Sequence, residues 1–181
     1  MVKVMDVRVG DVIDSRFDQI TRNLLKNYAK ASGDTNPVHT NDAIAEKAGL
    51  KGVIAHGLFS FGFISKLFED YLNQEKEGKI IKIDIDMRGM VRVDDLLITE
   101  AEVTKIEGKR IYFDVKQTTI TNIDIKKDGQ IVKLFEAGER GYITDKDIAR
   151  DLVKTKSVDE GILSYRERIA TPGKAIIELF E

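Results

Sequence analysis

The sequence predicts an α+β domain in which an antiparallel sheet curls around one buried helix. The first half of residues 57–72 is apolar on nearly every side, with only small Gly or Ser residues between the apolar ones. A helix with this pattern is typical of a protein interior. After residue 78, Val, Ile, Thr, Tyr and Phe dominate, as in strands. Glu-Gly at 107–108 and Asp-Gly at 128–129 suit hairpin turns, so the strands should run antiparallel.

Three short elements precede the apolar helix. A turn at residues 10–11 leads into a strand near residues 12–17. Thr21 can cap a helix over residues 22–32, and Gly33 ends it. The Asn-Asp pair at 41–42 can cap a second helix over residues 43–48.

The remaining chain predicts four long strands and a tail of different character. The strands are expected at residues 79–92, 96–107, 109–122 and 130–143. Residues 1–143 should therefore form a single domain. Residues 144–181 should form a C-terminal helical extension or arm, with a helix over about residues 147–154.

Composition limits the class of protein. A chain of 181 residues suits one domain with a substantial core. Hydrophobic residues make up 42% and charged residues 33%, while the net charge of −2 gives no electrostatic reason to expect a nucleic-acid partner. There is no cysteine, hence no disulfide or thiolate nucleophile. No apolar run is long enough to cross a membrane, and residues 1–6 lack a signal-peptide pattern, so a cytoplasmic protein is expected.

Both histidines lie in segments that suggest chemistry. His39 closes the segment Ser-Gly-Asp-Thr-Asn-Pro-Val-His at residues 32–39, and His56 belongs to Ile-Ala-His-Gly at residues 54–57. Asp34 stands five positions before His39, and a carboxylate beside an imidazole is an acid/base pair at neutral pH. A turn in which Asp34 only bonds backbone amides is the structural alternative.

These two segments, followed by an apolar helix, closely resemble the hydratase-2 motif of the MaoC-like dehydratases and (R)-specific enoyl-CoA hydratases. The resemblance spans roughly residues 8–143. It implies a hot-dog fold, in which an antiparallel sheet wraps a central helix. It also implies reversible syn addition of water across a trans-2-enoyl thioester, which gives the (R)-3-hydroxyacyl thioester.

The resemblance assigns Asp34 and His39 as the catalytic pair, with Asn36 shaping the loop between them. We expect Asp34 to activate the attacking water and His39 to supply the proton to C2. The N–H of Gly57 is expected to stabilise negative charge on the thioester oxygen, because a helix N-terminus offers free amides. We expect His56 to order the loop.

Ser65 matches a position that in similar hydratases can hydrogen-bond the catalytic pair. The alternative is a hydroxyl bonded to a carbonyl one turn earlier in the helix. Arg88 and Arg92 are expected to be ordinary solvated charges, and contact with substrate phosphates is their alternative. A metal site of Asp34, His39 and His56 is conceivable, but the family is metal-free, and we expect neither metal nor cofactor.

The expected substrate is an acyl-CoA or acyl-carrier-protein thioester, and the expected assembly is a homodimer or larger homo-oligomer without nucleic acid or membrane. Two other functions remain open at this point. The chain could be a non-catalytic acyl-thioester-binding partner subunit, or a hot-dog thioesterase in which water attacks the carbonyl. The intact pair of Asp34 and His39 argues against the first of these.

Overall fold

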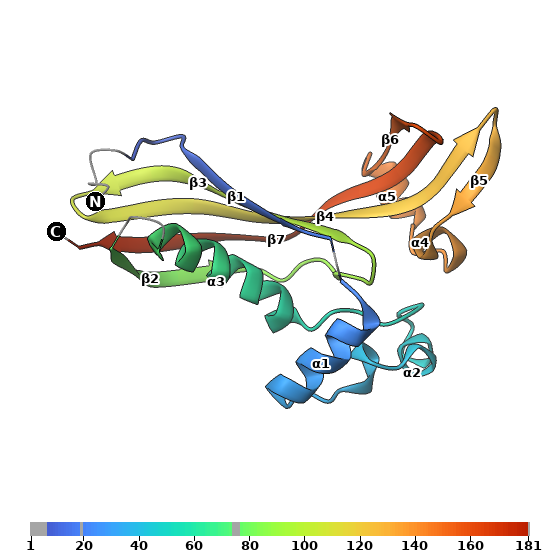
Figure 1. Cartoon of the computed structure of the whole chain (residues 1–181), viewed down its shortest axis with the longest axis horizontal. Helices are drawn as coiled ribbons and strands as arrows, with labels where there is room; N and C mark the ends of the chain where they lie inside the picture. The colour runs from blue at the N-terminus through green and yellow to red at the C-terminus, as the bar shows by residue number, and fades with distance from the viewer. Residues whose placement is uncertain (1–6, 19, 74–76, 181) are drawn as a thin grey trace.

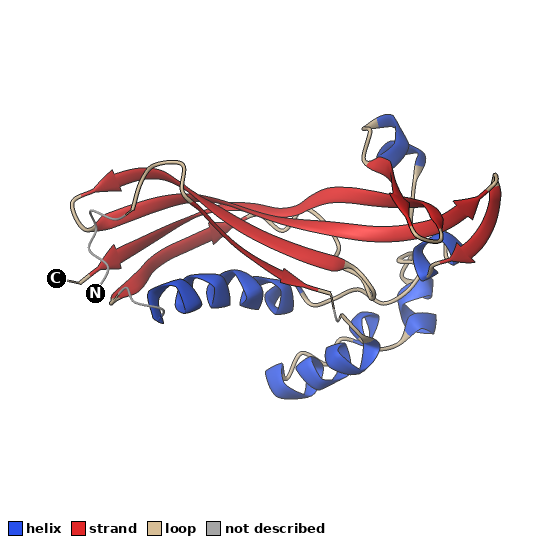
Figure 2. Cartoon of the chain, turned by 45° about the horizontal axis from the view of Figure 1, so that its top comes forward, coloured by secondary structure: helices blue, strands red, loops and turns tan. Residues whose placement is uncertain are grey.

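The computed structural model describes residues 7–18, 20–73 and 77–180, so the expectation for residues 1–6 lies outside the described residues. Helices and strands follow one another in separate runs, as in an α+β fold (Figures 1 and 2). The elements in chain order are β1 (Val12–Phe17), α1 (Arg22–Ser32), the 3₁₀ helix η2 (Pro37–His39), α2 (Asp42–Lys47), α3 (Gly57–Asn73), β2 (Gly78–Ile85), β3 (Leu96–Glu107), β4 (Arg110–Lys127), β5 (Gln130–Leu134), α4 (Glu136–Glu139), α5 (Asp145–Ala149), β6 (Val153–Val158) and β7 (Gly161–Leu179).

A single antiparallel sheet carries the fold, with the strand order β1-β3-β4-β7-β2. The short strand β5 adds to β4, and β6 adds to β7. Helix α3 lies along one face of this sheet, and α1 and α2 lie on the same side, beyond the N-terminal end of α3 (Figures 1 and 2). The expected arrangement of an antiparallel sheet with a central helix is therefore confirmed.

The main core lies between α3 and the sheet. Ile64 and Phe68 of α3 are fully buried, and they pack with Ile111 and Phe113 of β4 and Ile177 of β7. The rings of Phe68 and Phe113 meet edge to face, with centroids 5.1 Å apart. Alternate residues of β4 point inward, as the sequence pattern predicts for a half-buried strand. This core fixes the direction of α3 and hence the position of its first residue.

A second, smaller core supports α1 and α2. It includes Ile20, Leu25 and Phe59, each buried. Thr21 caps α1 as predicted, because its Oγ1 accepts a hydrogen bond from the N–H of Leu24 at 3.1 Å. Both predicted helices of this segment are confirmed to within one residue.

Several expected strand limits differ from the structure. The first long strand ends at residue 85 rather than 92, and the third continues to residue 127. The expected strand over residues 130–143 stops at Leu134, after which α4 begins. The reason is that β4 and β7 pair with each other beyond Ile120, which lies opposite Leu96, the first residue of β3, so that the shorter β5 only borders this extension.

The C-terminal segment corrects the expected domain division at residue 143. A short helix is present at Asp145–Ala149, but residues 161–179 form β7, which lies between β4 and β2 inside the sheet. Its backbone pairs with β4 from Ile162 to Glu178. Residues 144–181 are therefore not a helical extension, because the sheet is incomplete without them.

The pairing of β4 with β7 also creates a protruding arm, which we define as residues 121–166. Thr121 and Arg166 face each other at its base. The strands β5 and β6 and the helices α4 and α5 gather at its far end (Figure 1). Within the described ranges 7–18, 20–73 and 77–180, no helix is both long and apolar enough to traverse a lipid bilayer.

A chain truncated before residue 161 should lose cooperative unfolding, because β4 and β2 would each lose their shared neighbour. Thermal denaturation followed by circular dichroism checks this expectation. A control chain that ends at Leu179, the last residue of β7, should unfold like the full chain. A cooperative transition of the truncated chain at the full-chain temperature would show that β7 is dispensable.

Candidate functional site

Two segments bring the imidazole rings together. His39 ends η2, between α1 and α2, and His56 directly precedes α3. The rings stack with centroids 3.9 Å apart and planes inclined by 28°. The segment that carries His56 is bonded to the connection between β2 and β3, because the N–H of Ala55 donates a hydrogen bond to the carbonyl of Val91 at 2.8 Å. Residues far apart in the sequence thus share one site.

Each ring is also hydrogen-bonded to the backbone of the opposite segment. His39 Nδ1 lies 2.8 Å from the carbonyl oxygen of Ile54, and His56 Nε2 lies 3.0 Å from the carbonyl oxygen of Asp34. A carbonyl oxygen only accepts, so each of these nitrogens carries the proton. In the neutral rings, His39 Nε2 and His56 Nδ1 are consequently the acceptors.

His56 is a buried and neutral member of this pair, with 2% of its surface exposed. Burial lowers the pKa of its imidazole, and nearby His39 lowers it further, while the hydrogen bond to the Asp34 carbonyl opposes the shift. Its Nδ1 has no hydrogen-bond partner among the described residues. The ring also packs against Tyr28, with centroids 4.9 Å apart. These contacts fit the expected role in ordering the loop.

The loop that carries Asp34 is built from local turns. Gly33 ends α1 with a φ of 77°, a left-handed conformation that favours glycine. The Oδ1 atom of Asp34 accepts from the N–H of Asn36 at 3.2 Å, and Oδ1 of Asn36 accepts from the N–H of Val38 at 3.3 Å. Asn36 therefore caps η2, which carries His39. Asp34 therefore forms the backbone turn of the structural alternative and also lies close to His39, so the turn does not exclude the acid/base pair.

The structure brings the predicted acid/base pair together. A carboxylate oxygen of Asp34 and one nitrogen each of His39 and His56 lie within 4.8 Å of one another. In the part of the chain that the structure describes, no hydrogen bond joins the Asp34 carboxylate to either ring. Asp34 is exposed and His39 is half-buried. Both groups can therefore reach one small molecule from the solvent side.

The same three residues are poorly arranged for a metal ion. Ring nitrogens bind a metal through lone pairs that lie in the plane of each ring. Because the two imidazoles stack with nearly parallel planes, their lone pairs do not converge on one point. One nitrogen of each ring is already bonded to a carbonyl. The geometry favours proton chemistry over metal coordination.

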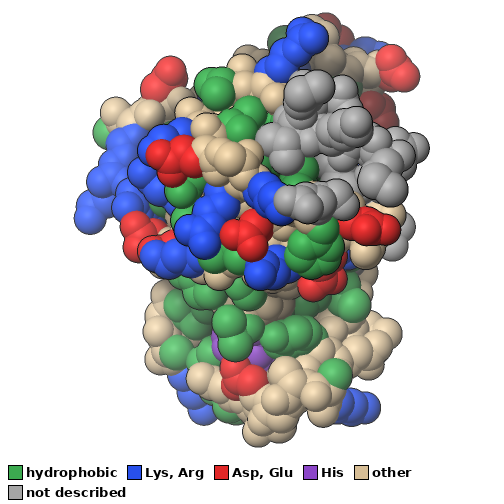
Figure 3. Space-filling model, turned by 90° about the vertical axis from the view of Figure 1, so that its left-hand side faces the viewer, with side chains coloured by type: hydrophobic (Ala, Val, Ile, Leu, Met, Phe, Trp, Pro, Cys, Tyr) green, Lys and Arg blue, Asp and Glu red, His purple; other side chains and the backbone are tan. Residues whose placement is uncertain are grey.

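An open cleft of about 230 Å³ lies beside His39. Its walls include Gly57 and Ser60 of α3, Met87 and Thr171. In Figure 3, histidine surface is visible in a hollow between apolar side chains, with an acidic side chain next to it. The wall is therefore apolar with a few polar groups, which is typical of small-molecule sites.

Gly57 is the residue whose N–H is expected to stabilise negative charge on the thioester oxygen. It is the first residue of α3 and lines the cleft. The first N–H groups of a helix have no partner within the helix, and the helix dipole makes that end favourable for negative charge. A Cβ at this position would collide with the thioether of Met87. The absence of a side chain thus leaves the backbone amide close to the cleft.

The two serines of α3 differ in their position relative to the cleft. Ser65 lies eight residues beyond Gly57, about 12 Å along the helix, and does not line the cleft. Ser60, one turn from Gly57, does line it and is 6% exposed. The carbonyl of Ser60 accepts from Nε2 of Gln117, a fully buried side chain of β4.

The two arginines that follow β2, Arg88 and Arg92, differ in their exposure to solvent. Arg88 is exposed at the cleft, where it pairs with Asp86 at 2.5 Å. Arg92 is only 5% exposed, and its guanidinium lies 4.0 Å from the ring centre of Tyr142. The expectation that Arg92 is a solvated charge or a phosphate contact is wrong, because its side chain is packed inside the protein. Neither the position of Met87 nor that of Gln117 was signalled by the sequence.

The chain is similar to several known proteins. A family model described as a MaoC like domain matches residues 7–127. Fatty acid synthase beta subunit TOXC of Cochliobolus carbonum is 35% identical over 82 residues, which are 45% of this chain and 4% of that protein. In this protein and three other long relatives, the region that matches the chain is only 4–9% of the relative's own length.

Two further proteins match over most of their length. The 3-hydroxybutyryl-CoA dehydratase of Methylorubrum extorquens is 26% identical over 126 residues, which cover 69% of this chain and 78% of that protein. The solved structure of the (R)-hydratase from A. caviae has a TM-score of 0.64 at 16% identity and covers 98% of this chain and 100% of that one. The hot-dog fold is thereby confirmed.

At about pH 6.5, where an ordinary imidazole is half protonated, His56 should be predominantly neutral, with its proton on Nε2. Because the pKa is lowered in the folded state, the unfolded chain binds more protons, and this group's contribution to stability falls as the pH drops below the ordinary value. Long-range ¹H–¹⁵N spectra of the imidazole report both properties. A doubly protonated ring, or a proton on Nδ1 alone, would contradict the assignment.

Proposed function

Since the chain belongs to the MaoC-like domain family, we propose that it catalyses the reversible syn hydration of trans-2-enoyl thioesters to (R)-3-hydroxyacyl thioesters. One observation carries the proposal. The Asp34 carboxylate lies within 4.8 Å of His39, and His39 lines a cleft that also reaches the start of α3. Addition of water needs a base and an acid close together, and these two residues supply both.

In the proposed mechanism, Asp34 takes a proton from the water that attacks C3. A carboxylate in contact with solvent is a proton acceptor, which suits this role. His39 enters the step protonated on both nitrogens and gives the Nε2 proton to C2, while its Nδ1–H remains bonded to the Ile54 carbonyl. Transfer of the proton from Asp34 to His39 then restores the starting state. The sum is one water added across the double bond.

The backbone amide of Gly57 is the proposed stabiliser of the enolate. Attack at C3 moves negative charge to the thioester oxygen, and a donor already aimed at that charge is commonly worth about 3–4 kcal/mol. The dipole of α3 acts in the same direction. We assign Ser60, rather than Ser65, as the neighbouring serine that shapes this end of the cleft within one chain.

The proposed substrate carries its acyl group on CoA or an acyl-carrier protein. The open cleft admits a thioester from the surface, and Arg88 at its rim is suited to contact a phosphate. The matched dehydratase from Methylorubrum extorquens has a CoA thioester in its name, which favours CoA.

Replacement of Asp34 by Asn, or of His39 by Ala, should lower kcat for crotonyl-CoA hydration by about 100- to 10,000-fold, because each removes one partner of proton transfer. The control Asp114→Asn removes an exposed carboxylate of β4 outside the cleft and should keep full activity. Loss of the enoyl absorbance measures turnover. Near-normal activity of either site variant would remove that residue from the mechanism.

The same assay separates the two other functions. Hydration consumes the enoyl absorbance without releasing free thiol, whereas a thioesterase releases CoA. Binding of crotonyl-CoA without either change would identify an accessory subunit instead.

We also propose a homodimer formed along β2. This strand is at the edge of the sheet, and the nearby side chains of Leu58, Met87 and Met90 are 66%, 52% and 39% exposed. Exposed apolar side chains next to an unpaired strand edge favour association. Light scattering should give twice the chain mass of 20.4 kDa. A monomeric mass in a preparation with full activity would contradict the dimer.

A further inference from the structure

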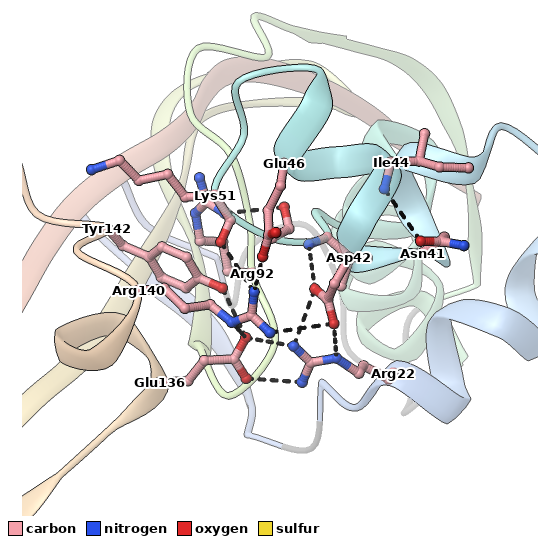
Figure 4. A network of polar contacts seen from close by, with 12 residues as sticks. Arg22, Asn41, Asp42, Ile44, Glu46, Lys51, Arg92, Glu136, Arg140 and Tyr142 are labelled. Atoms are coloured by element: carbon pink, nitrogen blue, oxygen red, sulfur yellow. Dashed lines mark hydrogen bonds and ion pairs between the residues drawn. The ribbon is translucent and has the colours of Figure 1, made fainter.

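Several charged side chains join the arm to the segment that carries the proposed acid/base pair, among them Glu46 of α2, which lies 2.6 Å from Arg140, and four that share their partners (Figure 4). We call these four the ion cluster: Arg22 at the start of α1, Asp42 at the start of α2, and Glu136 and Arg140 from the arm. Arg22 lies 2.9 Å from Asp42 and 2.5 Å from Glu136. Arg140 lies 3.5 Å from Asp42 and 3.0 Å from Glu136. Each arginine therefore contacts both carboxylates.

The ion cluster is more than a set of surface pairs. Arg22 binds Glu136 through two nitrogens, at 2.5 and 2.8 Å, and this two-point geometry is the stronger kind of ion pair. The side chain of Glu136 is 16% exposed, and its hydrogen bond from Arg22 lowers the pKa of its carboxyl. The hydroxyl of Tyr142 adds a bond to Glu136 at 2.8 Å. Isolated exposed pairs contribute little, but a partly buried network fixes geometry.

Further bonds tie the arm to the loop before His56. Arg140 donates to the carbonyl of Lys51 at 3.4 Å, and Lys51 donates to the carbonyl of Gly141 at 2.6 Å. A Cβ at Gly52 would meet the hydroxyl of Tyr142 at 2.5 Å, so the side chain of Tyr142 packs directly against the backbone of Gly52. The arm therefore contacts both segments of the site.

A short path leads from the ion cluster to the imidazole of His39. The Oδ1 atom of Asp42 accepts from the N–H of Val53 at 3.0 Å. The next residue, Ile54, provides the carbonyl that holds His39 Nδ1 at 2.8 Å. Asp42 also begins α2, three residues after His39. A shift of Asp42 would move both the ring and its backbone acceptor.

We propose that Glu136 and Arg140 are positioning residues for the loop of Asp34 and His39, so that the arm sets the rate of the reaction without touching the substrate. This inference rests on the proposed function. Small misplacements of reacting groups can cost up to about 100-fold in rate, whereas substrate affinity depends on the cleft itself. The arm thus acts on kcat rather than on KM.

Two variants of the same helix test the proposal. Glu136→Gln removes a charge from the ion cluster, and Glu139→Gln removes the same charge from an exposed position of α4. For crotonyl-CoA hydration, Glu136→Gln should lower kcat by about tenfold or more with KM within about twofold, and Glu139→Gln should behave like the unaltered protein. Unchanged kcat in a folded Glu136→Gln protein would overturn the proposal.

A second readout needs no turnover. Long-range ¹H–¹⁵N spectra recorded at alkaline pH, where an imidazole is neutral, should show His39 with its proton on Nδ1 in the unaltered protein, and a mixture of tautomers in Glu136→Gln. If the unaltered protein hydrates no enoyl thioester but Glu136→Gln still alters the His39 tautomer, the proposed function fails and the positioning role stands. An unaltered tautomer would overturn the positioning role.

If Glu136→Gln does not fold, Tyr142→Phe removes only one hydrogen bond to Glu136 and serves instead. It should lower kcat in the same direction by a smaller factor and leave KM unchanged. A normal kcat and a normal His39 tautomer in folded Tyr142→Phe would then refute the proposal.

Discussion

The candidate site depends on a reciprocal pair of hydrogen bonds between two loops. His39 in the first loop donates to the carbonyl of Ile54 in the second, and His56 in the second donates to the carbonyl of Asp34 in the first. Each bond fixes one ring and one backbone segment at once. Together with the stacking of the rings at 3.9 Å, they determine the tautomer of both imidazoles and the distance from the Asp34 carboxylate.

The rest of the fold holds this pair of loops in place. The buried face of α3 packs on β4 and β7, which places Gly57 at the cleft. Burial lowers the pKa of His56, whose Nε2 donates to the Asp34 carbonyl, and so disfavours its charged form. His39, by contrast, is half-buried with its Nε2 free to exchange protons. Two chemically identical side chains thus differ in role because of their surroundings.

Much of the fold follows from local pattern in the sequence. The nearly all-round apolar character of residues 57–64 predicts a buried helix, and the alternation at Ile111, Phe113 and Val115 predicts a half-buried strand. The turn residues around Asp34 predict a tight loop, and the spacing to His39 predicts a shared site. These signals lie within a few residues of each other, which is why a sequence reveals them.

What the sequence could not reveal depends on distant pairing. Nothing local in residues 161–179 shows that this strand lies between β4 and β2. The burial of Arg92 depends on Tyr142, fifty positions away. Ser60 rather than Ser65 lines the cleft because of where α3 begins relative to the sheet. Met87 contacts Gly57 because the chain that follows β2 turns toward the start of α3.

The central claim is that one carboxylate and one imidazole act on the same face of an enoyl thioester. Hydration of crotonyl-CoA in D₂O tests it most directly, with NMR analysis of the configuration at C2 and C3. The account predicts an (R)-3-hydroxy product in which deuterium and hydroxyl were added from the same face. Addition from opposite faces, or no hydration by the folded protein, would contradict it.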